Sequence, residues 1–237
     1  MKIKVLADSY AINKNFSIGW GVAFLVGDEL LFDTGETGDI LLHNMEQMGV
    51  SSATNLKTVV ISHDHWDHTG GLWALLKQNP QIKVYACPNF SLEFKEKVVS
   101  AEAELIEASR FTQIAEDIYT TGEIAGVYND KYMAEEALVI KSPKGLIILT
   151  GCAHPGIITI LEKVKENLSE DIYLVMGGFH LMGKNMQTIA LIIDKFRELK
   201  VTVAAPTHCS GKETEALFKK EYQNDFIPVK TGMTIEV

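Results

Sequence analysis

Two periodicities of apolar residues alternate along the 237-residue chain. Short runs rich in β-branched and apolar residues, each bounded by glycine, proline or aspartate, are typical of strands. Apolar residues that recur every three to four positions are typical of amphipathic helices. The pattern predicts strands at 21–26, 29–32, 58–62, 83–86, 137–141, 146–150, 172–176, 201–205 and 226–235, and helices at 40–48, 72–78, 92–99, 158–168, 187–199 and 213–222.

The order of these elements indicates the fold class. Turn-forming residues at 26–29 and 141–145 separate apolar runs and predict two hairpins. From residue 146 onward, strands and helices alternate regularly, as crossover connections do. This mixture predicts an α/β or α+β fold in which sheet is buried between helices. Because no repeat and no linker rich in proline, glycine or serine marks a boundary, we expect a single domain over residues 1–237.

Composition and charge narrow the class of partner. A content of 46% hydrophobic and 22% charged residues excludes disorder, collagen and low-complexity scaffolds. The formal net charge of -9 disfavours nucleic acid and anionic lipid as partners. The partner we expect is a small-molecule substrate. No apolar run is as long as a membrane span, and the first residues do not read as a signal peptide. The three cysteines are far apart in sequence, so a reducing cytoplasm is the expected location, while the oligomeric state is left open.

Histidine carries the candidate chemistry. Residues 62–71 hold His63, His65, Asp67 and His68 as His-x-His-x-Asp-His, directly after a predicted strand. A turn at the end of a strand lets side chains two or three positions apart converge, and zinc, manganese or iron accepts imidazole and carboxylate ligands. The alternative is a polar surface loop with histidines as caps, but so dense a motif is rare by chance. The run therefore predicts a metal site.

Three further histidines, His154, His180 and His208, each follow a predicted strand and precede a predicted helix. The carboxyl ends of strands in an open α/β sheet gather at one edge, where ligands bind. We therefore expect six of the seven histidines at that edge.

The chain resembles the metallo-β-lactamase superfamily. Residues 31–35 (Leu-Phe-Asp-Thr-Gly) resemble its first motif, the run 63–68 its second, His154 its third and His208 its fifth. The resemblance implies a four-layer αββα sandwich with a metal site at one edge of the two sheets. The runs 136–141, 145, 150–156, 178–181 and 206–209 also resemble a prokaryotic subfamily that bears the name dihydropterin-ribofuranosyl-aminobenzene phosphate synthase.

The resemblance also implies a ligand set. Asp33 would accept a hydrogen bond and orient a histidine ring; its alternative role is to fix the turn after a strand. Asp67 would in addition orient the attacking hydroxide. The implied ligands are His63, His65 and His154 for the first metal ion, and Asp67, His68 and His208 for the second.

The sequence departs from the superfamily pattern at the fourth motif. A bridging aspartate is expected near the end of the strand at 172–176, but the nearest acid, Asp171, stands at the other end. Residues 177–180 (Gly-Gly-Phe-His) occupy the expected place. His180 is therefore a candidate catalytic residue and metal ligand, which replaces the bridge, binds one ion only or faces the substrate.

These residues predict a metal-dependent hydrolase with one or two divalent ions per chain. Zinc is the first choice, with manganese and iron as alternatives. Water activated by metal would attack a small-molecule ester, a phosphate ester or phosphodiester. One alternative is an iron-dependent redox enzyme of the same superfamily, but flavodiiron-like members place Glu where His65 stands. Another is a non-catalytic metal-binding sensor, but structural zinc sites are closed and rich in cysteine.

Two kinds of residue near the motifs have competing interpretations. Three interpretations of Cys152 and Cys209 compete: soft metal ligands, redox sensors, or small residues buried behind a metal loop. Buried cysteines of the third kind are the commonest, so we favour that interpretation. Trp66 stacks on a substrate or packs its loop against the core, and packing is favoured.

Overall fold

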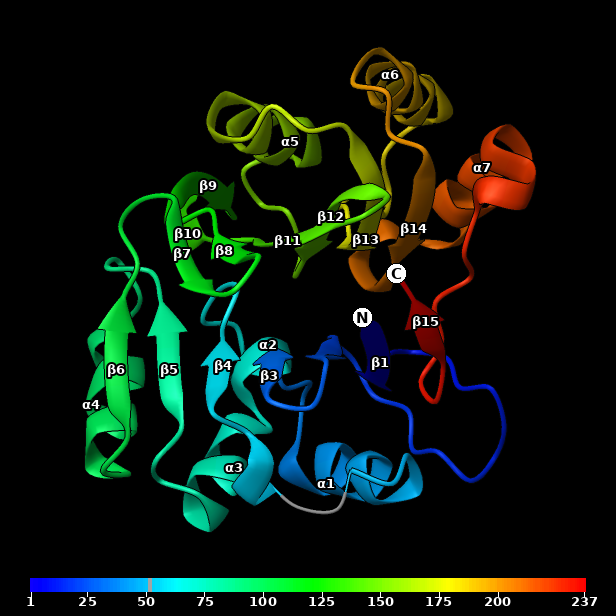
Figure 1. The fold of residues 1–237 in the computed structure, drawn as a ribbon. Helices are drawn as coiled ribbons and strands as arrows, with labels where there is room; N and C mark the ends of the chain where they lie inside the picture. The colour runs from blue at the N-terminus through cyan, green and yellow to red at the C-terminus, as the bar shows by residue number, and fades with distance from the viewer. Residues whose placement is uncertain (51–52) are drawn as a thin grey trace. The chain divides into compact units, whose positions relative to one another are not determined.

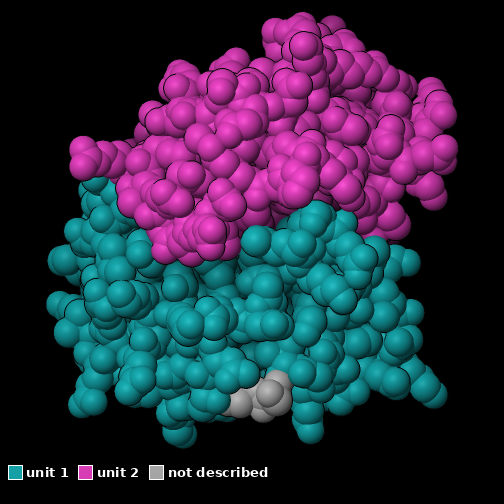
Figure 2. All heavy atoms as spheres, viewed as in Figure 1, with its two compact units in different colours: residues 1–109, 229–237 teal, residues 110–228 magenta. Residues whose placement is uncertain are grey.

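The computed structural model describes residues 1–50 and 53–237. The described chain falls into two compact units, unit 1 with residues 1–109 and 229–237 and unit 2 with residues 110–228 (Figure 2). Each unit has its own sheet and its own helices. Compact units are not by themselves domains, so the single domain expected over residues 1–237 stays a prediction.

The described residues of unit 1 form a seven-stranded mixed sheet in the order β15-β1-β2-β3-β4-β5-β6 (Figure 1). β1 pairs antiparallel with β15 and β2, β2 pairs antiparallel with β3, and β3 to β6 are parallel. Helix α1 packs on β1 and α4 on β6. The elements are β1 (Lys2–Ala7), β2 (Ala23–Val26), β3 (Leu30–Phe32), α1 (Gly38–Gln47), η1 (Ala53–Asn55), β4 (Thr58–Val60), α2 (Trp66–Thr69), α3 (Leu72–Gln78), β5 (Lys83–Ala86), α4 (Leu92–Ser100), β6 (Glu104–Glu107) and β15 (Thr234–Glu236).

Unit 2 contains a six-stranded mixed sheet in the order β14-β13-β12-β11-β8-β7 and a separate hairpin of β9 and β10, counted over the described chain. β12, β13 and β14 are parallel, whereas β11 is antiparallel to β12 and β8. The elements are β7 (Thr112–Ala115), β8 (Ile118–Thr120), β9 (Ile124–Tyr128), β10 (Lys131–Glu135), β11 (Leu138–Ser142), β12 (Gly145–Thr150), α5 (Ile157–Asn167), β13 (Ile172–Gly178), α6 (Met186–Glu198), β14 (Val203–Thr207), η2 (His208–Ser210), α7 (Lys212–Tyr222) and η3 (Gln223–Asp225).

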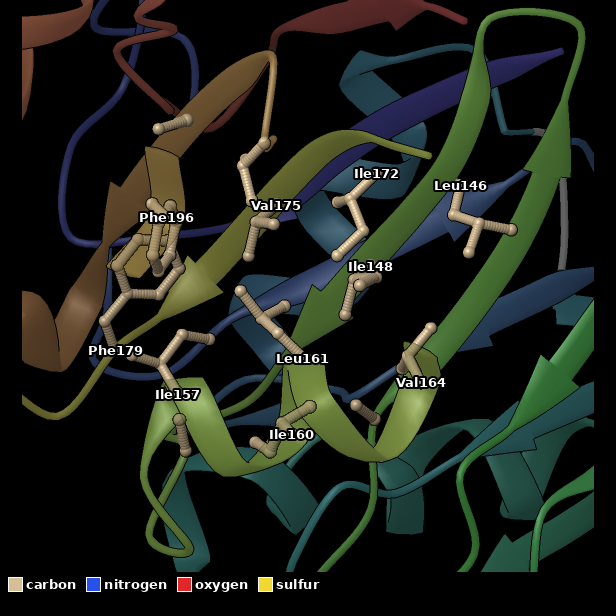
Figure 3. Packing of buried hydrophobic residues seen from close by; sticks show 14 of the residues in the cluster. Leu146, Ile148, Ile157, Ile160, Leu161, Val164, Ile172, Val175, Phe179 and Phe196 are labelled. Atoms are coloured by element: carbon tan, nitrogen blue, oxygen red, sulfur yellow. The ribbon is translucent and has the colours of Figure 1, made fainter. Parts of the chain in front are cut away.

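The core of unit 2 lies between its sheet and the helices α5, α6 and α7. Ile157, Ile160, Leu161 and Val164 form the buried stripe of α5 and share one apolar cluster with Ile148 of β12 (Figure 3). Full burial of such a side chain stabilises the fold by about 1.5–3 kcal/mol. This packing fixes the direction of β12, β13 and β14, whose carboxyl ends carry the residues discussed below.

Several helices begin at a polar cap. The Asn185 side chain accepts a hydrogen bond from the Thr188 N–H at 2.9 Å, and Thr37 and Ser91 cap α1 and α4 in the same way. The sequence predicted these helices within one or two residues of their bounds. Within the described part of the chain, no helix is both long enough and apolar enough to cross a membrane.

One predicted strand is mostly wrong. Of the strand expected over 226–235, only β15 (Thr234–Glu236) begins inside it. Pro228 has no N–H to donate to a strand ladder, and Gly232 adopts φ 92°, which interrupts extended backbone. β1 and the strands β6 to β10 were not predicted, because they lack a clear apolar run or are short and polar.

Candidate metal centre

Unit 1 presents its donors where two neighbouring strands end. β3 and β4 pair in parallel, so the residues that follow them meet at one edge of the sheet. Asp33 comes directly after β3, and the metal loop (residues 62–68) follows β4 and enters the one-turn helix α2. Gly21, with φ 87°, packs against the Asp67 carbonyl, where a Cβ atom would collide. Glycine at this position lets a neighbouring loop support the start of α2.

The buried carboxylate of Asp33 holds the metal loop in place. Its Oδ1 atom accepts a hydrogen bond from the Ser62 N–H at 2.7 Å, and Oδ2 accepts one from the Ser62 hydroxyl at 2.7 Å. Oδ2 also lies 2.7 Å from Nδ1 of His68. The Nδ1–H of His68 therefore donates to Asp33, and Nε2 is the nitrogen in position to bind a cation.

Three imidazoles gather around this loop. Nε2 of His63 lies 3.1 Å from Nδ1 of His65, and the ring centroids of His63 and His68 are 4.1 Å apart. Nε2 of His68 is 3.4 Å from Oδ2 of Asp67. Nitrogen and carboxylate donors at these separations are the arrangement that a divalent cation draws together.

The electrostatics of His68 follow from its two acidic neighbours. Burial disfavours the charged imidazolium, but Asp33 and Asp67 outweigh burial and raise the pKa of His68 to about 10. A ring with both nitrogens protonated cannot bind a metal ion through Nε2, so a cation would have to displace that proton.

In unit 2 a second buried carboxylate, that of Glu135, holds a loop and a histidine ring in place, as Asp33 does in unit 1. Glu135, at the end of β10, accepts the N–H groups of Cys152 at 3.0 Å and Ala153 at 2.6 Å through Oε1. Its Oε2 atom accepts the His154 N–H at 2.7 Å and lies 2.8 Å from Nδ1 of the same residue. Burial raises the pKa of this carboxyl, but His154 and the backbone donors outweigh it and lower the pKa of Glu135. Glu135 therefore orients the His154 ring with Nε2 directed away from the carboxylate.

A cluster of sulfur and nitrogen donors lies at the ends of β12, β13 and β14. The candidate ligand atoms of Cys152, His180 and Cys209, here called the thiol cluster, all lie within 4.8 Å of one another. Sγ of Cys152 is also 3.3 Å from Nε2 of His208, and the ring centroids of His154 and His180 are 4.6 Å apart. Burial raises the pKa of the Cys209 thiol, but Cys152 and His180 outweigh it and hold that pKa well below its usual range. The same contact with Cys209 raises the pKa of His180.

The backbone is strained at these same loops. Asp33 has φ 56°, Ala153 φ 65°, and His180 and His208 both φ 53°. Left-handed backbone is uncommon outside glycine and costs about 1–3 kcal/mol at each such residue. Strain of this kind is frequent at functional sites, where the surrounding structure holds it in place.

The structure places every predicted site residue in one of two donor sets. His43, the one histidine that was not predicted as a site residue, is exposed on α1, and its Nε2 lies 2.9 Å from the carbonyl oxygen of Asn15. Trp66 is 62% exposed, so the favoured expectation that it packs against the core is wrong. Unit 1 holds Asp33, His63, His65, Asp67 and His68, and unit 2 holds His154, His180 and His208.

Sequence reasoning missed Glu135. The signal was present in two adjacent acids, Glu135 and Glu136, directly before the apolar strand predicted at 137–141. An acid that is almost fully buried needs donors around it. The pattern indicates such a residue, but not which loop supplies the donors.

Comparisons with known proteins agree with this geometry. A family model described as a β-lactamase superfamily domain matches residues 29–124. The chain is 29% identical, over all of its length and 96% of the relative, to 7,8-dihydropterin-6-methyl-4-(β-D-ribofuranosyl)-aminobenzene-5'-phosphate synthase of Methanocaldococcus jannaschii. It is 30% identical to an uncharacterized protein of the same organism, over 99% of this chain and 100% of that protein.

A solved structure extends the likeness to three dimensions. The crystal structure of Tm1679, a metal-dependent hydrolase of the β-lactamase superfamily, matches with a TM-score of 0.84 and 29% identity over 100% of this chain and 99% of that one. The chain thus belongs to the metallo-β-lactamase superfamily. The α/β fold class of metallo-β-lactamase type predicted from the sequence is confirmed, and a divalent metal site follows from membership.

Proposed function

We propose that the protein is a metal-dependent hydrolase that cleaves an ester of a small molecule, a phosphate ester or phosphodiester. The observation that carries the proposal is the contact between Asp33 and His68, 2.7 Å between Oδ2 and Nδ1. A carboxylate that fixes the ring of a metal-binding histidine is a recurrent partner of catalytic metal ions. Glu135 and His154 repeat the arrangement in unit 2.

The residues present suit a divalent cation. His68 and His154, each held by a carboxylate through Nδ1, offer Nε2 to a cation. The metal loop adds the imidazoles of His63 and His65 and the carboxylate of Asp67, which lie close together. Such a mixture of nitrogen and oxygen donors suits zinc, manganese or iron. Following the superfamily motifs, we propose that His63, His65 and His154 hold one ion and that Asp67, His68 and His208 hold a second.

The chain's own residues would divide the work of hydrolysis. A divalent cation supplies a Lewis acid and lowers the pKa of a water molecule. Asp67 is 4% exposed and would orient that water through its carboxylate. Asp33 would keep Nδ1 of His68 protonated, so that the ring does not rotate during the reaction. His180, whose Nδ1 atom is buried, would face either the cation or the leaving group.

A cavity in unit 1 offers a surface for the substrate. It measures about 300 Å³ and its lining combines aromatic rings, one lysine and three acids: Trp66, Trp73, Phe94, Lys97, Glu36, Asp64 and Glu93. The Lys97 ammonium lies 3.9 Å from the centroid of the Trp73 ring. Aromatic faces bind a flat organic group, which supports a small organic molecule as the substrate class. The three acids outnumber Lys97, so the phosphate part of the proposal rests on the metal ligands and not on this cavity.

The redox and sensor alternatives have less support. The metal loop has His65 where flavodiiron-like members carry Glu. A sensor site is closed by cysteine ligands, whereas imidazole and carboxylate donors dominate the metal loop of unit 1.

Metal content and an ester panel test the proposal together. The purified protein is analysed for bound elements, stripped with a chelator, reloaded with zinc, manganese or iron, and assayed on phosphodiesters, phosphomonoesters, lactones and thioesters. We expect one or two ions per chain and metal-dependent cleavage of a phosphate ester. His63→Ala should lose metal and activity, whereas His43→Ala, which removes the exposed histidine of α1, should keep both.

Two results would contradict the proposal. One is a full complement of metal with no hydrolysis of any ester in the panel. The other is two iron ions with turnover that requires oxygen, which would favour the redox alternative.

A synthase is the second candidate function, because a full-length relative bears that name. In this case the amine of a ribofuranosyl-aminobenzene phosphate would displace a leaving group from the 6-methyl carbon of an activated dihydropterin, with release of that group and a proton, and no ester would be cleaved. Incubation of the metal-loaded protein with both compounds, followed by mass spectrometry, distinguishes the two: a joined product favours the synthase.

A further inference from the structure

The thiol cluster offers donors that the ligand set implied by the superfamily does not use. Cys152, His180 and Cys209 come from the loops after three adjacent parallel strands, β12, β13 and β14. Both cysteines are buried, with 5% and 8% of their surface exposed. Nδ1 of His180 is buried and has no hydrogen-bond partner among the described residues. Three ligand atoms from separate loops therefore face one small volume.

The end of β13 explains why sulfur occupies this place. A Cβ atom at Gly178 would stand 2.6 Å from Sγ of Cys209 and would collide with the carbonyl oxygen of Gly151. At Gly177, φ is 130° and a Cβ atom would collide with the carbonyl oxygen of Thr150. The superfamily pattern expects a bridging aspartate near the end of this strand. The fold leaves no room for a side chain at Gly177 or Gly178, and the Cys209 thiol lies beside Gly178.

We propose that Cys152, His180 and Cys209 bind a thiophilic divalent cation, and that the Cys209 thiolate stands in for the missing bridging carboxylate. Two thiolates and an imidazole suit zinc, and also cobalt or cadmium, and leave a fourth position open for an exogenous ligand. Cys209 is well placed for this role because its neighbour His208 belongs to the expected ligand set. The bridging role of Cys209 rests on the proposed function, because it assumes the metal centre of the proposed hydrolase.

Cobalt is a spectroscopic probe for this assignment. The full-length protein, stripped of metal, is titrated with Co²⁺, and the near-ultraviolet absorption that arises from charge transfer between thiolate and cobalt is recorded. We expect this band in the wild type, a weaker band in each of Cys209→Ser and Cys152→Ser, and its loss when both cysteines are replaced. Cys87→Ser is the matched control, because Cys87 is a buried cysteine in unit 1 that is not part of the thiol cluster, and it should keep the band.

A measurement without substitution protects the test against variants that fail to fold. X-ray absorption of the zinc-loaded wild type should find sulfur at about 2.3 Å from the metal. A spectrum explained by nitrogen and oxygen alone would overturn the proposal, as would a cobalt band that persists when both Cys152 and Cys209 are replaced.

These readouts separate the inference from the proposed function. Phosphate ester hydrolysis by a protein without cobalt–sulfur absorption would overturn the thiolate ligands and leave the hydrolase standing. The absorption in a protein that hydrolyses no ester would support the thiolate ligands and contradict the hydrolase.

Discussion

The carboxylate of Glu135 accepts hydrogen bonds from both the backbone and the ring of His154, at 2.7 and 2.8 Å. One side chain thus sets the position of the loop and the rotation of the ring. Asp33 does the same for the metal loop and His68 in unit 1.

Replacement of Glu135 by glutamine tests this coupling. The amide nitrogen of glutamine cannot accept a hydrogen bond, so at least one donor of the loop at 152–154 loses its partner. We expect the free energy of unfolding to fall by about 1–3 kcal/mol and metal affinity to fall about 10–100-fold. Chemical denaturation and competition with a chelating dye measure the two effects. Glu170→Gln, at a partly exposed ion pair with Lys141 that is remote from the loop at 152–154 in sequence, is the control and should change metal affinity little.

Replacement of Asp33 by asparagine tests the same arrangement in unit 1. An asparagine turned to accept from His68 and the Ser62 hydroxyl presents its amide nitrogen to the Ser62 N–H, and the opposite orientation deprives both His68 and the Ser62 hydroxyl of their acceptor. We expect the metal affinity of the protein to fall about 10–100-fold. The control is Asp64→Asn, because Asp64 lies in the same loop but accepts only from the backbone of Ser91 in the contacts described here. Equal metal affinity in both variants, measured by the same competition, would refute the role of Asp33.

Gly178→Ala tests the crowding at the end of β13. The added Cβ atom would stand 2.6 Å from Sγ of Cys209, so the thiol must move. Overpacking of this kind costs about 1–3 kcal/mol, and we also expect weaker cobalt–thiolate absorption. Gly183→Ala meets no atom within 4 Å but has φ 77°, so it should lower stability through backbone strain alone and leave the absorption intact. An unchanged absorption spectrum in Gly178→Ala would argue against the crowding.

The stability of the fold should fall at high pH because of Tyr222. Burial raises the pKa of Tyr222 from 10.0 to about 12, and its buried hydroxyl has no hydrogen-bond partner among the described residues. The unfolded chain therefore releases this proton at a lower pH than the folded protein, and stability is lost as the pH rises from about 10 to about 12. Urea unfolding at pH 8 and pH 11 should show a smaller loss for Tyr222→Phe than for the wild type. Equal losses would show that another group causes the dependence.

The sequence predicted best those elements in which apolar periodicity is strong. The α5 and α6 helices carry a buried stripe and were found within a residue of their bounds. β6 and β7 read Glu-Leu-Ile-Glu and Thr-Gln-Ile-Ala and are partly exposed, so no period distinguishes them from a loop. Their strand character comes from pairing with neighbours, which depends on residues far away in the sequence.

In the candidate site, too, residues in a local motif could be predicted, whereas a partner from a distant part of the sequence could not. The dense motif around His63 and the acid after β3 could be recognised because their spacing in sequence is fixed by local geometry. The sequence also offered His180, Cys152 and Cys209 as candidate ligands, but not Glu135, because Glu135 meets the loop at 152–154 through the path of β11 and β12. A partner that lies 17 to 19 residues away carries no spacing rule.

The left-handed backbone at Asp33, Ala153, His180 and His208 has a consequence for protein engineering. Asp33 orients His68, and His180 and His208 are proposed ligands, so the strain at these three residues is tied to the proposed chemistry. Ala153 has only a methyl group at φ 65°, and glycine adopts that conformation readily. Ala153→Gly would relax the backbone without removing a polar side chain, and its effect on heat resistance would measure that strain against the loss of a methyl group buried in the apolar cluster of unit 2.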